Sequence, residues 1–458
     1  MSQYECQGCG ASFPKWAGQC GTCFEWNSLI EVDKPSKADK KQLVKKKKSK
    51  PTPLKQVQKK DNVIIPTGIS EVDELLGSGL VMGSVLLMSG EPGIGKSTLS
   101  LQLCLNLANS GKRVLYVSAE ESDVQLRLRA ERLGPVPDSL FVFTESNMAT
   151  ILSQLDDINP DVVLLDSIQV VYHPEIGAVQ GSVSQLRFCA SVLIDWVKAH
   201  EKSAIIIGHI TKEGHIAGPK VLEHLVDVIL YLEGQRQWQY RILRSFKNRY
   251  ASTDHIALFE MKQEGLLPLS DPSQFFIKSQ CFDQPGSVIV PYCEGQRVFL
   301  LEIQALVVES GYGMAKRNFV GVDPNRANLL IAALDKLFRL RLSAHDVFLS
   351  IIGGLKISDP SIDLAIIVSI VSSLRLQAVA NRMGIIGEVG LTGEIRPVSH
   401  IKRRLIELKK CGFSRCMLPE KNKADELAEC GVELHYVSHV REVLNHLFVN
   451  EVAYAGKD

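Results

Sequence analysis

The chain has 458 residues, of which 45% are hydrophobic and 22% are charged. This length and composition fit about three folded domains and exclude a disordered or collagen-like chain. The formal net charge is only +1. That balance hides an asymmetry, because residues 34–60 hold 12 Lys and a single acid and carry +11, which leaves −10 for the rest of the chain. A basic segment joined to a mildly acidic body indicates an anionic partner.

The N-terminal segment lacks the basic stretch and following apolar run of a secretory signal. The longest apolar run, residues 362–374, is interrupted by Asp363 and three serines and is too short to span a bilayer. We therefore expect a cytoplasmic protein with no membrane partner. In that reducing compartment its 11 cysteines should not form a disulfide framework.

Four cysteines near the N-terminus form two Cys-x2-Cys pairs. They are Cys6, Cys9, Cys20 and Cys23. This spacing lets both thiolates of each pair bind the same ion and close a tetrahedral site. Because so short a segment cannot bury a core of its own, a metal would replace the core. We predict a zinc finger over residues 1–28. Four cysteines without metal, or a redox pair, are the alternatives.

The segment that follows, residues 29–60, is rich in Ser, Pro and Lys. Repulsion between its charges favours an extended, flexible linker. Two interpretations stay open for it. The segment either only keeps the chain in solution, or it makes salt-sensitive contacts with the phosphates of a nucleic acid.

The most specific motif is the segment GEPGIGKST, which follows an apolar strand expected at residues 84–88 and precedes a helix expected at 98–108. This is the context of a phosphate-binding Walker A loop. Its glycines let backbone N–H groups surround the phosphates, Lys96 reaches the β and γ oxygens, and Ser97 can bind Mg²⁺. We predict ATP and Mg²⁺ as cofactors. The predicted nucleotide-binding residues are Gly90, Glu91, Pro92, Gly93, Ile94, Gly95, Lys96, Ser97 and Thr98.

Two further apolar strands, expected at residues 114–118 and 162–165, lead into acidic residues. Such continuous apolar runs are typical of parallel strands buried on both faces. Asp166 would lie at a carboxyl end of the sheet and hold Mg²⁺ as a Walker B acid. Glu120 is the best candidate for polarising the attacking water. The alternative is that Glu121 is catalytic and Glu120 only begins a helix.

Together with the four cysteines and the Walker A loop, the segments LLDS (164–167) and Lys247-Asn248-Arg249 resemble the RadA family, also called Sms. These are bacterial DNA-repair proteins with a RecA-like core, and the resemblance spans essentially the whole chain. By resemblance, Lys247 and Arg249 would reach the nucleotide of a neighbouring subunit and act like arginine fingers. The alternative is a basic surface strand. The family usually continues with Phe-Gly, whereas Tyr250 and Ala251 follow here.

An active site shared between subunits implies a homo-oligomer. The resemblance favours a hexameric ring similar to helicases of the DnaB type, with single-stranded and branched DNA and a RecA-type recombinase as partners. In such motors the loops after core strands face the DNA channel, here residues 177–187 and 211–220. Ordinary solvated loops are the alternative. The candidate DNA-binding residues are Arg187, Lys212 and Lys220.

After Pro272 the pattern changes to strands expected at 287–290 and 297–308 and a helix expected at 325–340. Residues 273–458 resemble the proteolytic domain of Lon. By this resemblance Asp359-Pro360-Ser361 corresponds to the nucleophile loop and Lys402 to the general base. A Ser and a desolvated Lys suffice for such chemistry.

The chain departs from that peptidase pattern at Ile362 and Asp363, where the peptidase loop has small residues. This bulk and extra carboxylate should spoil an oxyanion site, which needs close backbone approach. We therefore expect a scaffold that serves oligomerisation and contact with duplex DNA. The basic residues Lys402, Arg403 and Arg404 either make that contact or form a solvated helical face.

The predicted fold is α/β: a RecA-like P-loop ATPase core at 61–272, a small N-terminal zinc finger at 1–28, a basic linker at 29–60 and a C-terminal Lon-protease-like α/β domain at 273–458. The predicted function is a DNA-dependent ATPase, a ring-shaped helicase that promotes branch migration or strand-exchange extension in recombinational DNA repair. The alternatives are an ATP-dependent Lon-like serine protease and a non-translocating ATP switch that loads a recombinase.

Overall fold

The computed structural model describes residues 3–6, 11–22, 24, 26, 28–32, 53, 64–209, 222–234, 240–277, 284–311, 315–353, 355–379 and 383–448. The chain divides into two compact units, Met1–Leu269 and Ser270–Asp458. Among the residues just given, no helix is both long enough and apolar enough to cross a membrane. Both units combine sheets with helices, in agreement with the predicted α/β class.

A small antiparallel sheet lies near the N-terminus, with β1 between its two neighbours. Its strands are β1 (Gln3–Cys6), β2 (Ser12–Phe13) and β3 (Leu29–Val32). Cys6, Cys20 and Leu29 are buried together and form its small core. So few apolar residues cannot hold a fold alone, as expected for a metal-stabilised finger.

The first unit is built on a nine-stranded sheet with the order β14-β13-β12-β11-β6-β10-β9-β7-β8. Neighbouring strands from β11 to β8 are parallel, and β12 to β14 extend the sheet in antiparallel fashion. The bounds are β6 (Val85–Gly90), β7 (Val114–Ser118), β8 (Leu140–Thr144), β9 (Val162–Asp166), β10 (Ser203–His209), β11 (Val228–Glu233), β12 (Tyr240–Asn248), β13 (Ile256–Lys262) and β14 (Gly265–Pro268).

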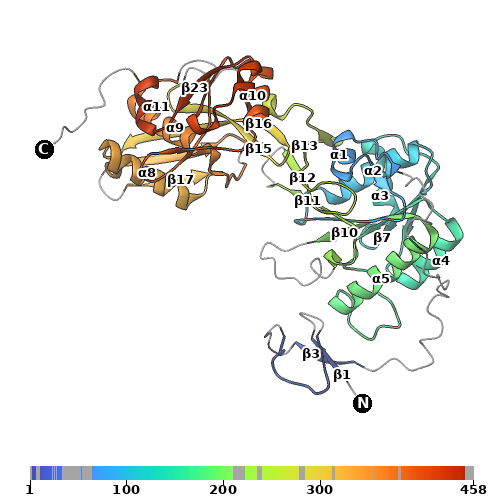
Figure 1. Ribbon diagram of the computed structural model, residues 1–458. Coiled ribbons are helices and arrows are strands. Elements are labelled where there is room, and N and C mark those ends of the chain that lie inside the picture. Colours follow the sequence, from blue (N-terminus) through green and yellow to red (C-terminus); the bar gives the residue numbers. More distant parts are fainter. Residues whose placement is uncertain are drawn as a thin grey trace. The chain divides into compact units, whose positions relative to one another are not determined.

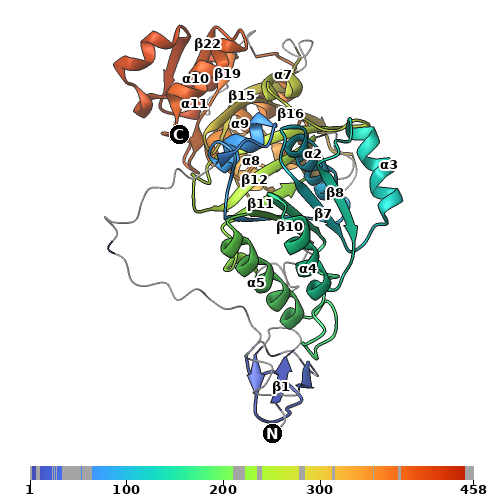
Figure 2. The same cartoon turned by 90° about the vertical axis from the view of Figure 1, so that its right-hand side faces the viewer.

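Helices cover both faces of this sheet and create two apolar cores (Figures 1 and 2). On one face lie α1 (Ser70–Leu76), α2 (Lys96–Asn109) and α3 (Asp123–Leu133). On the other lie α4 (Met148–Ile158) and α5 (Val183–His200). Since the central strands are buried on both sides, they are apolar throughout, and the carboxyl ends of the parallel strands offer the place for a ligand. A short ribbon pairs β4 (Ile64–Ile65) with β5 (Leu80–Val81).

The second unit contains a seven-stranded mixed sheet with the order β17-β18-β16-β15-β19-β22-β23. A two-stranded ribbon, β20 (Glu388–Val389) with β21 (Ile395–Arg396), accompanies it. The bounds in the large sheet are β15 (Ser287–Glu294), β16 (Arg297–Glu309), β17 (Arg317–Val320), β18 (His345–Ile351), β19 (Met383–Ile385), β22 (Arg415–Pro419) and β23 (Glu433–Val437).

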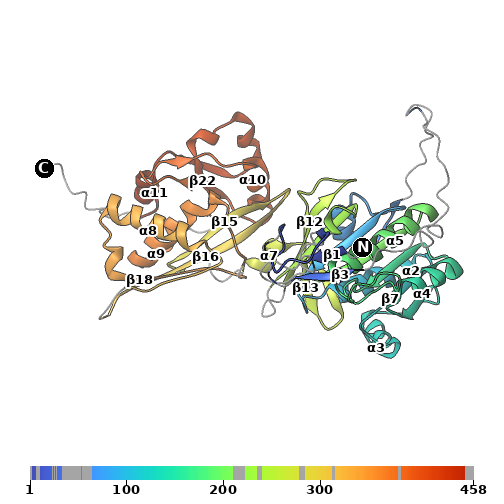
Figure 3. The ribbon, with the colours of Figure 1, turned by 90° about the horizontal axis from the view of Figure 1, so that it is seen from below.

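The helices of this unit are α7 (Pro272–Phe276), α8 (Pro324–Phe338), α9 (Asp363–Arg375), α10 (Ile401–Lys410) and α11 (Val440–Leu447). Helix α9 is buried over almost its whole length and packs on β15 and β16, with α8 beside it (Figure 3). The apolar run that is too short for a membrane span is therefore the central helix of this unit. Helix α10 also packs on β15 and β16.

Candidate functional site

The Walker A segment forms a tight loop between β6 and α2, which begins at Lys96. Gly90 and Gly95 have positive φ angles of 152° and 115°. A Cβ atom on Gly90 would lie 2.4 Å from the carbonyl oxygen of Leu232, so a larger residue has no room there. Backbone geometry and close packing both require glycine at these positions, as a phosphate loop demands.

Lys96 lies at the start of α2 with its ammonium group buried against its own loop. Its Nζ donates hydrogen bonds of 2.9 Å to the carbonyl oxygens of Gly90 and Glu91. Burial lowers the pKa of Lys96 to about 8, while the nearby charges of Asp166 and Glu120 act in the opposite direction. The predicted cation and both predicted acids therefore lie close enough to interact. Ser97 and Thr98 are half-buried in the first turn of the helix.

The two acids come from neighbouring parallel strands. Asp166 is the last residue of β9, and Ser118 of β7 lies beside it in the register. The hydroxyl of Tyr116 donates a 2.7 Å hydrogen bond to Oδ2 of Asp166. The hydroxyl of Ser167 donates to Oε1 of Glu120. The carboxyl ends of β6, β7 and β9 thus bring Lys96, Glu120 and Asp166 to one edge of the sheet.

Glu121, the alternative catalytic acid, has a different environment from Glu120. Its carboxylate pairs with Arg129 of α3, and its backbone N–H donates to the hydroxyl of Ser118. Helix α3 begins after Ser122, which forms a capping box with Gln125. Glu121 is therefore held by α3, whereas Glu120 is hydrogen-bonded to the residue next to Asp166. This arrangement favours Glu120 as the acid at the nucleotide.

Lys247 and Arg249 lie at and just beyond the end of β12. Nζ of Lys247 donates to the carbonyl oxygens of Glu223 and Val226, at 2.6 and 2.8 Å. Arg249 donates to Oδ1 of Asp227 at 3.2 Å, although its side chain is 53% exposed. Burial and the charge of Arg249 lower the pKa of Lys247. Both cations are thus bound within their own subunit.

The departure from the family pattern at Tyr250 and Ala251 leaves the local backbone intact. The side chain of Asn248 accepts hydrogen bonds from both backbone N–H groups, at 2.8 and 3.1 Å. Neither residue needs the positive φ angle that glycine favours. The methyl group of Ala251 instead lies against Gly77, where a Cβ atom would come within 2.6 Å of it.

The first predicted DNA loop is partly helical. Ser182 caps α5 by accepting a hydrogen bond from the backbone N–H of Gln185, so residues 183–187 are helix and not loop. Arg187 is exposed on that helix. The expected loop at 177–187 is therefore wrong in its last five residues. Arg187 has a helical backbone because the cap at Ser182 fixes the start of α5. Lys212 and Lys220 lie outside the described residues.

Two of the four predicted zinc ligands, Cys6 and Cys20, are described and both are buried. The backbone N–H of Thr22 donates to Sγ of Cys20 at 3.4 Å, and Sγ of Cys6 is 3.2 Å from the hydroxyl of Ser28. An amide directed at sulfur suits a metal-bound thiolate, so the surroundings of Cys20 fit a zinc ligand. Cys9 and Cys23 lie outside the described residues, and among the rest no group of three potential ligands occurs.

The peptidase-like loop of the second unit contains a buried hydroxyl held by charged partners. Ser361 is 2% exposed, and its hydroxyl donates to Oδ2 of Asp359 at 2.7 Å. Nη1 of Arg404 donates to the same hydroxyl at 3.2 Å, and Nη2 donates to Asp359 at 3.3 Å. The cation beside the serine is therefore a guanidinium, which does not accept a proton and cannot take the place of the lysine amine in a Ser–Lys pair.

Lys402 does not lie where the resemblance to Lon would put a general base, and the expected surface position of Arg404 is wrong. The side chain of Lys402 is 57% exposed and its Nζ lies 3.8 Å from Oε2 of Glu426, whereas Arg404 is 1% exposed on the buried face of α10. Two residues along a helix are separated by about 200°, so the two side chains point in opposite directions. Lys402 does not approach Ser361, and Arg404 offers no surface to DNA. Arg403 is exposed.

Asp363, expected to disturb an oxyanion site, is tied into the fold. It is buried, pairs with Arg326 of α8 and accepts a 3.1 Å hydrogen bond from the backbone N–H of Val389. Burial raises the pKa of Asp363, and the bond to Arg326 opposes that shift. This carboxylate joins α8, α9 and β20 and serves the architecture of the unit.

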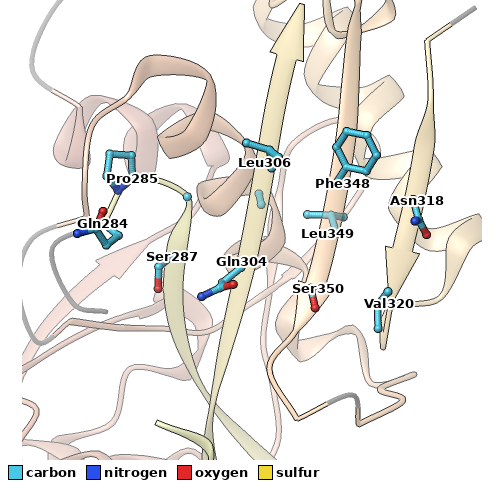
Figure 4. A pocket seen from close by; sticks show the side chains of 12 residues that line it. Gln284, Pro285, Ser287, Gln304, Leu306, Asn318, Val320, Phe348, Leu349 and Ser350 are labelled. Atoms are coloured by element: carbon cyan, nitrogen blue, oxygen red, sulfur yellow. The ribbon is translucent and has the colours of Figure 1, made fainter. Parts of the chain in front are cut away.

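A cavity of about 390 Å³ lies elsewhere in this unit (Figure 4). It opens on the sheet face that carries Gln304 and Leu306 of β16, next to Phe348 of β18 and Asn318 of β17. Leu300, on the same face of β16, is covered by the core beneath α10. Neither Ser361 nor Lys402 lines the cavity, so the peptidase-like residues have no substrate pocket there.

Sequence reasoning missed Tyr116 and Asp227, and it named Ser167 and Arg404 without the contacts that they make. The first had a signal, since a tyrosine in an aliphatic strand must find a partner for its hydroxyl. Arg404 also had one, because it shares the helical spacing of Ile401, Leu405 and Leu408. No sequence signal indicated Asp227, because its role depends on contacts between strands that are distant in the sequence.

Three family models match separate parts of the chain. An ATPase model described as KaiC matches residues 65–138, and a rubredoxin metal-binding model matches residues 4–31. The C-terminal proteolytic domain of Lon protease (S16) matches residues 342–450. These matches support the ATPase core, the zinc finger and the Lon-like domain as classes of fold.

Close relatives cover nearly the full length. DNA repair protein RadA of Aquifex aeolicus is 43% identical over 97% of this chain and 98% of its own. The RadA proteins of Listeria monocytogenes and Bacillus subtilis are each 42% identical over 97% of this chain, and over 97% and 98% of their own lengths. At this identity and coverage, the chain belongs to the RadA family of DNA repair proteins, whose core is a RecA-like ATPase.

Proposed function

We propose that the chain is an ATP-driven DNA motor that forms a hexameric ring and moves along single-stranded DNA. It would promote branch migration or strand-exchange extension on branched DNA, together with a RecA-type recombinase. The observation that carries the proposal is the meeting of Lys96, Glu120 and Asp166 at the carboxyl ends of neighbouring parallel strands. The name of the relatives, DNA repair protein, supports DNA as the partner.

In the proposed reaction the backbone of the phosphate loop binds the phosphates of ATP. Phosphate oxygens replace the carbonyl groups that now accept from Lys96, and Ser97 and Asp166 hold Mg²⁺. Glu120 orients and polarises the attacking water. Its hydrogen bond from Ser167 supports this role because it keeps the carboxylate beside Asp166.

A shared active site is proposed for the ring. The half-exposed guanidinium of Arg249, with Lys247 near it, would exchange its partner in its own subunit for the γ-phosphate of a neighbour. Arg187, together with the predicted loop residues Lys212 and Lys220, would contact DNA phosphates. Ring assembly and DNA contact are thus the parts of the proposal that involve a second molecule.

The proposed domain limits are those expected from the sequence: zinc finger 1–28, basic linker 29–60, ATPase 61–272 and Lon-like domain 273–458. We propose that Cys6, Cys9, Cys20 and Cys23 bind structural Zn²⁺, for which the buried sulfurs of Cys6 and Cys20 provide support. A reducing cytoplasm suits such thiolates. The Lon-like domain would act as a scaffold, because Arg404 and not a lysine amine lies beside Ser361.

The deciding experiment measures strand separation on a forked DNA with ATP. Wild-type protein should separate the strands in one direction, and Lys96→Ala should lose both ATP hydrolysis and separation. Arg249→Ala should keep the fold and ATP binding but lose DNA-stimulated hydrolysis. Hydrolysis without any strand separation would contradict the motor and favour the alternative of a switch that loads a recombinase. Degradation of casein that Ser361→Ala abolishes would favour the protease.

A further inference from the structure

Two hydroxyl groups, neither of them a predicted site residue, each hold one acid of the ATP site. We propose that Tyr116 and Ser167 are positioning residues of the ATPase, Tyr116 orienting Asp166 toward Mg²⁺ and Ser167 orienting Glu120 toward the attacking water. The inference rests on ATP hydrolysis, and it does not depend on DNA translocation. It deepens the proposed reaction by naming what fixes its two carboxylates.

Tyr116 lies in the middle of β7, beside β9, and is fully buried. A tyrosine there costs free energy unless its hydroxyl is hydrogen-bonded, and phenylalanine would fill the same space without that requirement. The hydroxyl donates to Oδ2 of Asp166, which would leave Oδ1 for the metal or its water shell.

Ser167 directly follows Asp166 and is also fully buried. Its hydroxyl donates to Glu120, which lies beyond the end of β7. The two hydrogen bonds therefore run in opposite directions between the strands. Tyr116 of β7 donates to Asp166 of β9, and Ser167, which follows β9, donates to Glu120, which follows β7. Each carboxylate is fixed by a residue next to or near the other acid, so the pair is set as a unit before ATP arrives. Such support matters because small displacements of catalytic groups are costly.

The test compares Tyr116→Phe with Ser167→Ala in the full-length protein. Binding of a fluorescent ADP is titrated with Mg²⁺, and kcat is measured at saturating Mg²⁺–ATP. Tyr116→Phe should raise the half-saturating Mg²⁺ concentration about 10-fold, since support of a metal ligand is lost. Ser167→Ala should leave that concentration unchanged and lower kcat about 10-fold. A residue that only packs would not produce this split.

Tyr292→Phe is the matched control, because it removes a tyrosine–carboxylate hydrogen bond, to Glu294, in the other unit. It should change neither quantity. In an Asp166→Asn background, Tyr116→Phe should have no further effect on the Mg²⁺ titration, since its partner is already altered.

A wild-type Mg²⁺ titration for a folded Tyr116→Phe protein overturns the role of Tyr116, and a wild-type kcat for Ser167→Ala overturns that of Ser167. The second variant tests the inference independently if the first does not fold. If the wild-type protein hydrolyses ATP but separates no strands, the motor proposal fails and this inference stands. Absence of hydrolysis by the wild-type protein would overturn both.

Discussion

The phosphate loop of the first unit and the Ser361 loop of the second each lie against a buried cation, Lys96 at the start of α2 and Arg404 in α10. Lys96 donates to two carbonyl groups of its own loop, which phosphate oxygens can replace. Arg404 donates to Asp359, Ser361 and the backbone oxygens of Pro291 and Ser399, and its donors are largely used. A buried cation therefore indicates a binding function when a ligand can replace its partners. It indicates a structural role when its partners are fixed parts of the fold.

The largest expected effect tests the functional side of this comparison. Glu120→Gln should lower ATP hydrolysis about 10²–10⁴-fold, because it removes the group that polarises water, while nucleotide binding is preserved. Glu121→Gln is the matched control and should change hydrolysis little, since that carboxylate pairs with Arg129. Steady-state phosphate release and ADP binding measure both effects. The reverse order of effects would make Glu121 the catalytic acid.

Next in size is the loss of Arg404. Arg404→Ala leaves Asp359 and several backbone oxygens without their donor and should reduce the free energy of unfolding of the second unit by about 3–5 kcal/mol. Lys402→Ala, two residues away and exposed, should change it by less than about 0.5 kcal/mol. Urea unfolding of the full-length protein, followed in each unit, gives both values. Equal, small effects would show that Arg404 is not a structural residue.

A smaller effect is expected for the serine that Arg404 contacts. Ser361→Ala removes one hydroxyl from a buried network and should cost about 1–2 kcal/mol of stability. Casein should stay intact with the wild-type protein and with this variant. Any peptide cleavage that needs Ser361 would show that the Ser361 site is catalytic and not only structural.

The smallest effect is a proton taken up on nucleotide binding. Because the pKa of Lys96 is about 8 in the free protein, about half of the amines lack a proton at pH 8. Bound phosphates raise that pKa, so binding should take up about half a proton at pH 8 and progressively less at lower pH. Calorimetric titration in two buffers with different ionisation enthalpies measures the uptake. Lys96→Arg, which stays charged, should abolish it.

The sequence predicted the ATP site better than the peptidase-like site because of how each is built. The Walker A loop is local, so nine consecutive residues specify strand, loop and helix, and Asp166 follows from the apolar strand before it. The partner of Ser361 is 43 residues away. Identifying it as Arg404 and not Lys402 requires the rotational phase of α10, which Ile401 and Leu408 indicate but the family motif does not.

The extent of the first sheet was also difficult to predict. Strands β12 to β14 are antiparallel additions whose register depends on contacts with distant strands. The edge strand β8 is half-exposed although four of its five residues are apolar, because it has a neighbouring strand on one side only. The helical position of Arg187 depends on a single cap at Ser182.

In the proposed ring, Asp227 would connect Arg249 to the phosphate loop of the same subunit. One oxygen of its carboxylate binds Arg249, and the other accepts a 3.1 Å hydrogen bond from the backbone N–H of Val85, the first residue of the strand that leads into the phosphate loop. If Arg249 turns to a neighbour's nucleotide in the proposed ring, Asp227 would lose a partner at the first residue of β6 in its own subunit. The occupancy of one site would then be transmitted along this single strand to the next site, which would provide a short mechanical route for sequential ATP hydrolysis around the ring.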